Sequence, residues 1–287
     1  MSIVYQIIIN SIIAGSLYSL IALGFNLIYS TTRFFNLAHG ALIAVGGYTF
    51  FYFAEKLGLG IIPSLIIGII VSGLFGYLFD KLVFKKLRQN KASNMASLVA
   101  SLGIMTVIQA ILAMLFSSRF QILGSGYDFK LYQFIGSTIT TPQVMIFFSI
   151  IVVAVGLICT LRFTKFGKEV RAVSDNEQVA KVIGINTDRV IGKVFFLGSA
   201  IAGLSGILVG FDTGIEPTMG FSLLLKGVIA SIIGTVGNVY GGIFGAFLLA
   251  FIENFAVWQI SGEWKDAVAF AILIIFLIIR PNGLLKK

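Results

Sequence analysis

The chain has 287 residues, of which 57% are hydrophobic and only 11% are charged. A soluble globular domain carries about a quarter charged residues, so this composition excludes an ordinary soluble domain and indicates a polytopic membrane protein. The formal net charge is +9, but the basic residues stand in short loops beside apolar runs, where they indicate membrane topology rather than a nucleic-acid site.

Apolar runs of about 20 residues, the length that crosses a bilayer, recur along the chain. The first lies in the uncharged stretch Met1–Thr32 and exceeds the core of a signal peptide, so we expect a retained span. Backbone amides cannot stay unpaired in lipid, which favours helices over an open sheet. The sequence therefore predicts an all-α, polytopic transmembrane helical bundle with about eight membrane segments, some of them re-entrant. These segments are Tyr5–Tyr29, Phe34–Phe53, Ile61–Phe79, Met95–Phe116, Gln143–Leu161, Val190–Phe211, Gly227–Ile252 and Trp264–Ile279.

Two loops hold most of the positive charge, Asp80–Lys91 and Arg162–Lys193, and both are expected in the cytoplasm. The nearly uncharged hairpin Ser117–Pro142 is expected to face outward. If every segment crossed, both chain ends would lie outside, although the basic C-terminus favours the inside. The conflict disappears if Phe34–Phe53 and Gly227–Ile252 enter and return on the outer side as broken elements. The alternative is that both are ordinary helices with packing glycines.

The second of these loops carries a third of all charged residues in the chain. Phe166–Val173 predicts a short helix, Ser174 with Glu177 forms a capping-box pattern for a second one, and Gly184 is placed to end it. Asn186–Asp188 offers an N-cap for the next span. We expect a helix pair at the cytoplasmic surface whose apolar face enters a groove on a partner, the alternative being that it rests on lipid headgroups. The face consists of Ala172, Val173, Val179, Ala180, Val182 and Ile183.

Side chains that carry chemistry are scarce. The sequence has no G-x-x-x-x-G-K-[ST] phosphate loop, so the chain is expected to be neither an ATPase nor another enzyme. One histidine and one cysteine are too few for a zinc cluster or a Ser/His/Asp set. The ionisable residues of the spans fall near the ends of apolar runs, unlike the mid-membrane relays of ion-driven carriers. These residues are Asp80, Lys226, Glu253 and Asp266.

Four stretches resemble, in the correct order, the LivH-type permeases, the inner-membrane subunits of branched-chain amino-acid ABC importers. They are GFNLIYSTTRFFNLAHGALIAVGGY (Gly24–Tyr48), a charged loop with its following span (Gly167–Gly210), KGVIASIIGTVGNVYGGIFGAFLLAFIEN (Lys226–Asn254) and RPNGLL (Arg280–Leu285). The likeness covers nearly the whole chain. The ending is shared with simple-sugar permeases, whereas the NLAHG motif (Asn36–Gly40) favours the amino-acid branch.

The resemblance implies one transmembrane permease domain, residues 1–287, with a cytoplasmic coupling segment at about 162–189. It implies a multi-pass protein of the bacterial inner membrane that forms a heterodimer with a second related permease. Two ABC ATPase subunits, which bind ATP and Mg, and a periplasmic substrate-binding protein complete the expected complex. The substrate would be a branched-chain or other hydrophobic amino acid, and this chain itself would hold no cofactor, metal or nucleic acid.

The resemblance also implies roles for individual residues. The ATPase contact would lie on Glu169, Arg171, Ala172, Asp175, Ala180, Gly184 and Ile185. Asn36, His39 and Gly40 would lie near the translocation path, unless His39 is simply a satisfied buried histidine. The break at Gly237 and Asn238 points to the same path. Two alternatives stay open: an ABC permease for urea, short amides or simple sugars, and a stand-alone channel or secondary transporter. Neighbouring genes for ATPases and a secreted binding protein would separate the two classes.

Overall fold

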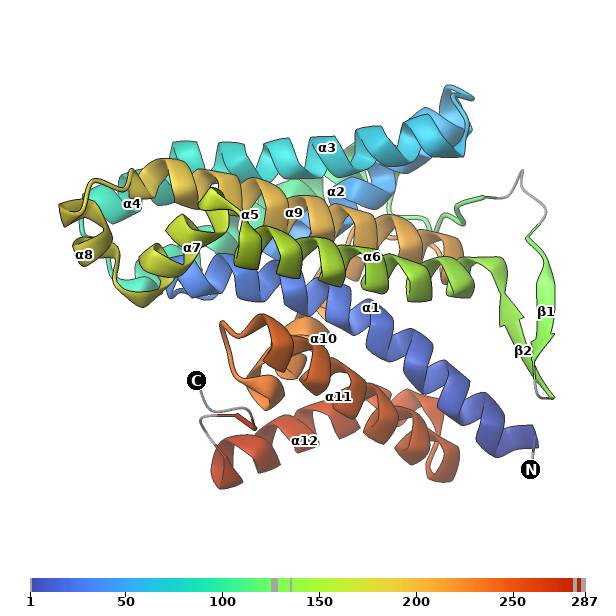
Figure 1. The fold of residues 1–287 in the computed structure, drawn as a ribbon. Coiled ribbons are helices and arrows are strands. Elements are labelled where there is room, and N and C mark those ends of the chain that lie inside the picture. Colours follow the sequence, from blue (N-terminus) through green and yellow to red (C-terminus); the bar gives the residue numbers. More distant parts are fainter. Residues whose placement is uncertain (1, 125–128, 135, 281–282, 285–287) are drawn as a thin grey trace.

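The computed structural model describes residues 2–124, 129–134, 136–280 and 283–284, and long helices make up most of it (Figure 1). Within this part, six helices are long and apolar enough to cross a membrane. The elements are α1 (Ser2–Thr32), α2 (Ala38–Phe51), a π-helical turn (Tyr52–Lys56), α3 (Ile61–Phe79), a second π-helical turn (Asp80–Phe84), α4 (Lys85–Gln89), α5 (Asn94–Phe116), β1 (Leu131–Phe134), β2 (Ser137–Thr140), α6 (Thr141–Phe163), α7 (Lys165–Asp175), α8 (Glu177–Val182), α9 (Thr187–Asp212), α10 (Met219–Gly234), α11 (Val239–Gln259), a 3₁₀ turn (Gly262–Trp264) and α12 (Lys265–Ile279).

The predicted all-α membrane bundle is confirmed, and seven of its expected segments correspond to single helices. The remaining one, Gly227–Ile252, is two helices, because the chain turns between α10 and α11. Thr235 and Gly237 there take φ values of +108° and +80°, which no helix accommodates. The Asn238 side chain then accepts hydrogen bonds from the Tyr240 and Gly241 amides and starts α11.

The two basic loops lie at one end of the bundle, with α4, α7 and α8, and the β1–β2 hairpin lies at the opposite end (Figure 1). Ion pairs join the two loops. Lys85 Nζ lies 3.3 Å from Asp188 Oδ2, and Arg88 Nη2 lies 3.7 Å from Asp188 Oδ1. Both positive loops therefore belong to one end, which the positive-inside rule assigns to the cytoplasm.

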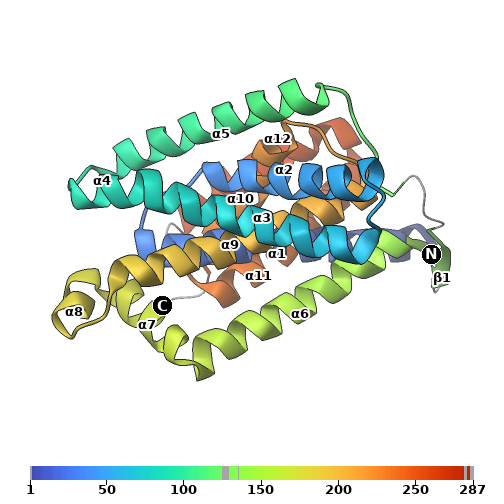
Figure 2. The same cartoon turned by 90° about the horizontal axis from the view of Figure 1, so that it is seen from above.

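The expected re-entry of Phe34–Phe53 is wrong, because α2 advances steadily beside α5 (Figure 2). The Leu37 amide donates to Ser101 Oγ at 3.0 Å, and the Tyr48 ring lies 4.9 Å from that of Phe116, the last residue of α5. Fifteen helical residues separate those two contacts on α5, about 22 Å. The glycines of α2 do not break the helix; they allow close contact with α9.

The α10–α11 pair does enter from the hairpin end and return to it, as the break in its sequence suggested (Figures 1 and 2). With α2 running through the bundle and this pair returning, α1 begins at the hairpin end and α12 ends toward the α4 end (Figure 1). This arrangement removes the conflict between loop charge and the basic C-terminus. Of the RPNGLL ending, Pro281, Asn282 and Leu285 lie outside the described residues.

Helices α1 and α9 form the centre of the bundle. A Cβ atom added to Gly24 would meet the Gly198 carbonyl oxygen at 2.6 Å, and one added to Gly198 would meet the Gly24 carbonyl oxygen at 2.8 Å. The two backbones therefore touch, a packing mode suited to lipid, where small residues let helices approach. By contrast, α3, α5 and α6 expose isoleucine, valine and phenylalanine side chains on their outer faces, as lipid-facing helices do.

Candidate functional site

The charged segment forms two short helices, α7 and α8, that project from one end of the bundle (Figures 1 and 2). Thr164 joins the two helices: it ends α6, and its hydroxyl accepts a hydrogen bond from the Gly167 amide, 3.0 Å long, that begins α7. A side chain at Gly167 would collide with the backbone of Thr160 and Leu161. The Arg171 guanidinium donates to the Leu161 carbonyl. These contacts fix the direction of α7 relative to α6.

The start of α8 differs from the expected capping box. Asn176 is its N-cap, with Oδ1 accepting the Gln178 and Val179 amides at 2.9 and 3.1 Å. Ser174 is still part of α7, and its carbonyl accepts from Arg33. The prediction failed because asparagine two residues later is an equally good cap and stands where the backbone leaves α7.

The other end of the segment follows the prediction. Gly184 takes a φ of +87° just after α8, the left-handed conformation typical of a helix end. Asn186 then caps α9, accepting the Arg189 amide at 3.0 Å. Lys181 pairs with Glu177 at 2.7 Å, and the Thr187 hydroxyl donates to the same carboxylate at 3.3 Å. The segment is thus closed at both ends by local hydrogen bonds.

The apolar residues of the segment do not form the single face that was expected. Val173 and Ala180 are only 3% and 1% exposed and pack in the core of the bundle with residues of α1 and α9. Val182 and Ile183 are 86% and 67% exposed, and Val179 points outward with them. One half of the apolar set therefore anchors the segment, and the other half forms an exposed tip at the end of α8. We call Val179, Val182 and Ile183 the α8 tip.

The seven expected ATPase-contact residues divide in the same way. Ala180 is buried and inaccessible to a partner in this conformation. Arg171, Asp175 and Gly184 are exposed, and the remaining three are half-buried. The exposed residues Arg171, Asp175 and Gly184 and the α8 tip together form a polar surface with a small apolar patch. Such a surface is suitable for docking into a groove.

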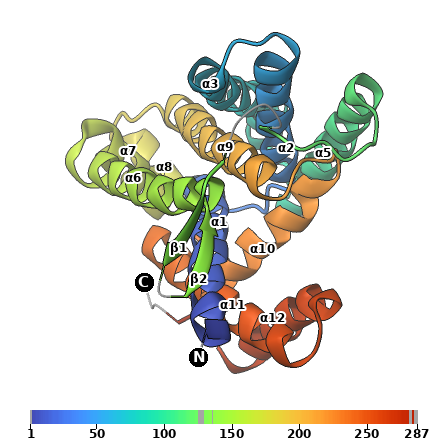
Figure 3. The same ribbon diagram turned by 90° about the vertical axis from the view of Figure 1, so that its right-hand side faces the viewer.

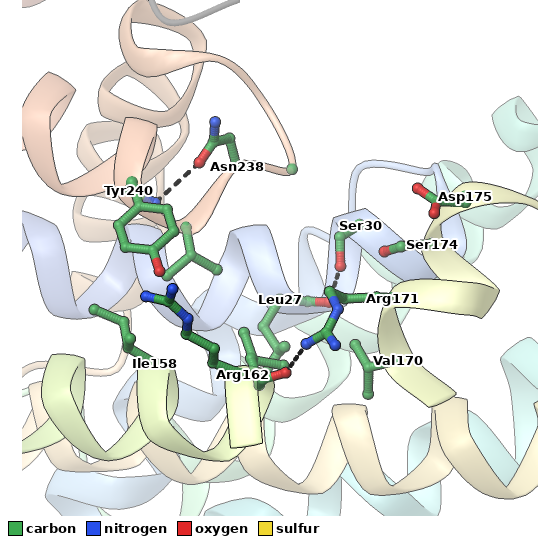
Figure 4. A pocket seen from close by; sticks show the side chains of 13 residues that line it. Leu27, Ser30, Ile158, Arg162, Val170, Arg171, Ser174, Asp175, Asn238 and Tyr240 are labelled. Atoms are coloured by element: carbon green, nitrogen blue, oxygen red, sulfur yellow. Dashed lines mark hydrogen bonds between the residues drawn. The ribbon is translucent and has the colours of Figure 1, made fainter. Parts of the chain in front are cut away.

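A pocket of about 440 Å³ lies where α7 meets the α10–α11 turn (Figure 4). Arg171 and Asp175 line it from α7, and Gly237 and Asn238 line it from the turn. The turn is held to α1 by a hydrogen bond from the Gly237 amide to Asn26 Oδ1, 2.8 Å long. The coupling segment and one pair of expected path residues are therefore neighbours, which nothing in their sequence spacing indicated.

The other expected path residues lie inside the bundle. Asn36 and His39 are buried at the irregular start of α2, where the His39 ring packs against Gly24 and Phe25. Within the described residues, neither ring nitrogen of His39 completes a hydrogen bond, although the Ile21 carbonyl interacts with the ring. A Cβ at Gly40 would lie 2.6 Å from the Gly220 carbonyl oxygen of α10. The expected path residues therefore form two separate groups, one at the start of α2 and one at the Gly237–Asn238 turn. Both groups contact the same stretch of α1, at Gly24 and at Asn26.

Sequence reasoning missed a cluster of charges around the buried residues Lys226 and Glu253. Lys226 Nζ lies 2.7 Å from both Glu253 Oε1 and Asp266 Oδ1, and the Tyr18 hydroxyl donates to Glu253 Oε2 at 2.8 Å. Glu253 is 0% exposed. The expectation that these ionisable residues end apolar runs is wrong for Lys226, which lies in the middle of α10. The cluster connects α1, α10, α11 and α12.

Comparison with known proteins places the chain among transport permeases. The family model described as "Branched-chain amino acid transport system / permease component" matches residues 7–277. The chain is 29% identical to the high-affinity branched-chain amino acid transport system permease protein LivH of Salmonella typhimurium, over 98% of this chain and 95% of that protein. It is 28% identical to BraD of Pseudomonas aeruginosa, named in the same way, with the same coverage.

A solved structure, PsaBC from Streptococcus pneumoniae in complex with Fab, shares the fold. Its TM-score is 0.51 with 14% identity, over 95% of this chain and 91% of that one. At this identity the likeness concerns the arrangement of helices alone. The family match and the six helices able to cross a bilayer support a multi-pass membrane protein.

Proposed function

The chain belongs to the branched-chain amino acid transport permease family, and from that premise we propose that it is the membrane-spanning subunit of an ABC importer for branched-chain or other hydrophobic amino acids. Transport would be powered by two separate ATPase subunits. A second related permease would complete the membrane part as a heterodimer, and a periplasmic binding protein would deliver substrate. The site of action would be the bacterial inner membrane, and ATP and Mg would be held by the ATPases.

The observation that carries this proposal is the construction of α7 and α8. A segment that is anchored on one side by buried Val173 and Ala180 and exposes an apolar tip on the other can transmit force between a docked partner and the bundle. Fully burying a valine contributes about 1.5–3 kcal/mol, so the anchor resists being pulled from the bundle. A push on the α8 tip therefore moves the segment as one unit.

The movement has a short route into the membrane part. Arg171 and Asp175 of α7 line the same pocket as the α10–α11 turn (Figure 4), and Gly237 in that turn is bound to Asn26 of α1. Displacement of α7 would alter this contact and tilt α1 against its neighbours. We propose that ATP binding in the partner chains uses this route to alternate the access of the substrate path between the two membrane faces.

Reconstitution tests the function directly. The chain would be assembled in proteoliposomes with its proposed ATPases, second permease and binding protein. We expect ATP-dependent uptake of labelled leucine, isoleucine or valine, with much weaker uptake of urea or ribose as comparison solutes. Uptake of amino acids by this chain alone against a gradient, or transport restricted to urea or sugar, would contradict the proposal.

A further inference from the structure

A second cavity opens near the hairpin end of the bundle, away from the coupling segment. It has a volume of about 360 Å³ and lies between α1, α6, α9, the start of α10, and the facing ends of α11 and α12. Figure 3, which views this end, shows α1 in the middle with α6 and α9 on one side and α11 and α12 on the other. Small-molecule pockets in proteins have volumes of about 300–1,000 Å³, so this cavity suits a small solute.

An acid and a base that are not paired with each other stand in this cavity. Asp212 is the last residue of α9, and Lys265 is the first residue of α12. The two charges attract each other electrostatically, and Gln143 lines the same cavity beside them. Among the described residues, however, neither charge forms a salt bridge, whereas Lys226 and Glu253 nearby are in direct contact at 2.7 Å. Separated opposite charges of this kind fit the ammonium and carboxylate groups of a zwitterion.

Besides the polar residues Asn10, Gln143, Thr213 and Asn254, the lining has apolar residues that suit an aliphatic side chain. Leu17 and Ile13 of α1, Ile146 of α6, Val209 of α9 and Leu223 of α10 supply apolar surface. Apolar walls together with convergent polar groups are typical of sites that bind small molecules.

The cavity is also linked to the buried charge cluster. Tyr18 lines the cavity, and its hydroxyl donates to Glu253 Oε2 at 2.8 Å. A bound molecule would therefore touch a residue that is fixed by the ion pairs of α10, α11 and α12. Occupancy and the position of these helices would be coupled through this one side chain.

We propose that this cavity binds a free aliphatic amino acid, with Asp212 holding its ammonium group and Lys265 its carboxylate. The apolar side chain lies against Leu17, Val209 and Leu223. This inference rests on the proposed function and deepens it: specificity for branched-chain zwitterions is then built into this chain as well as into a binding protein. The cavity lies at the end opposite the coupling segment, where substrate enters.

Thiol protection tests occupancy on the full-length chain. Thr213→Cys, placed in a Cys159→Ser background, puts a thiol in the cavity lining, and Thr218→Cys is the matched control on the same loop outside it. The protein is held in nanodiscs that contain no ethanolamine lipid, because that headgroup also carries an ammonium. We expect leucine to slow modification at Thr213→Cys and to leave Thr218→Cys unchanged. Equal rates with and without leucine, or slowing only by added phosphatidylethanolamine, would overturn the proposal.

Two analogues assign the charges. Compared with leucine, 4-methylpentanoate lacks the ammonium and 3-methylbutylamine lacks the carboxylate. A hydrogen bond to a charged group is worth enough that each analogue should protect about 10- to 100-fold less well than leucine. Asp212→Asn should remove the preference over 4-methylpentanoate, and Lys265→Gln the preference over 3-methylbutylamine. Glu216→Gln, an exposed acid on the same loop, should change neither preference.

A crossed pattern of this kind is not produced by general loss of structure, because each variant changes discrimination against one analogue only. If both variants keep the wild-type preferences, the site is wrong even if the complex transports leucine normally. If the wild-type complex transports no amino acid but leucine still protects Thr213→Cys, the proposed function fails and the site stands.

Discussion

At the scale of single residues, the exposed α8 tip differs sharply from the buried residues only a few positions away. Val182→Asp or Ile183→Asp is expected to reduce substrate-stimulated ATP hydrolysis of the assembled complex at least about tenfold, because the charge prevents burial in a partner groove. The stability of the chain should change by no more than about 0.5 kcal/mol, since both side chains are exposed. ATPase assays and thermal unfolding in detergent give the two readouts.

The control for this prediction is Gln178→Asp, which adds a charge to an exposed position of α8 outside the apolar tip. It should keep stimulation near the wild-type value. Ala180 is a poor place for such a test, although the sequence suggested it, because it is 1% exposed and any larger side chain would disturb the anchor. Normal stimulation in the Val182→Asp and Ile183→Asp variants would show that the tip does not dock.

The buried charge cluster supports a second prediction. Lys226→Met leaves the fully buried Glu253 without its cation and should destabilise the chain by about 3–5 kcal/mol. Replacing both residues together, Lys226→Met with Glu253→Met, should cost less than the single change, because no unpaired charge stays buried. Lys181→Met, which breaks an exposed pair with Glu177, should cost only about 0.3–0.5 kcal/mol. Unfolding midpoints of the wild type and the three variants would measure this order. A double variant less stable than Lys226→Met alone would contradict it.

At the scale of helices, the sequence predicted the positions of most elements. The prediction failed where one residue type, a lysine or a glycine, is compatible with two structures. Apolar length predicted α1, α3, α5, α6 and α9 within a few residues, because bilayer thickness sets a firm lower bound on a span. Lys226 was read as the boundary of a segment, and so the first half of α10 was overlooked. A buried lysine is tolerated there only because Glu253 and Asp266 meet it, and both come from later in the chain. Such long-range pairing leaves no trace in a window of local sequence.

Glycine had the same ambiguity. The glycines of α2 and those around the α10–α11 turn look alike in sequence, yet α2 continues through its glycines, whereas Gly237 stands where α10 has ended. What decides between them is the neighbour: α2 meets α9 across its glycines, whereas Gly237 takes a positive φ and binds Asn26. The candidate site was predictable as a charged segment, but its anchor and tip were not, because burial against α1 and α9 depends on the folded bundle.

Close contact between α1 and α9 gives a prediction at this scale. Gly24→Ala puts a methyl group 2.6 Å from the Gly198 carbonyl oxygen, so the two helices must separate, at a cost of about 1–3 kcal/mol. Gly103→Ala on α5 is the matched control, since an added Cβ there meets nothing within 4 Å. It should be neutral or stabilise by about 0.5–1 kcal/mol through the helix preference of alanine. Thermal unfolding of both variants measures the difference. Equal midpoints would mean that α1 and α9 are not in close backbone contact at Gly24.

At the scale of the whole molecule, the direction of the first helix fixes the topology of all the others. The positive-inside rule assigns the α4, α7 and α8 end to the cytoplasm, and α1 begins at the opposite end (Figure 1). The chain therefore starts outside, although a re-entrant Phe34–Phe53 would have required it to start inside. Only the course of α2, which runs alongside α5 without turning back, distinguishes these two arrangements.

Single cysteines in a Cys159→Ser background decide between them. Ile3→Cys and Ser117→Cys should both react with a membrane-impermeant thiol reagent in spheroplasts, because both lie at the outer end of the bundle. Asn176→Cys, between α7 and α8, should react only after the membrane is permeabilised. Ser117→Cys is outside in either arrangement and controls for reagent access. Protection of Ile3→Cys until permeabilisation would mean that α1 crosses in the other direction. The arrangement of helices that places the Asp212–Lys265 cavity at the outer side would then be wrong.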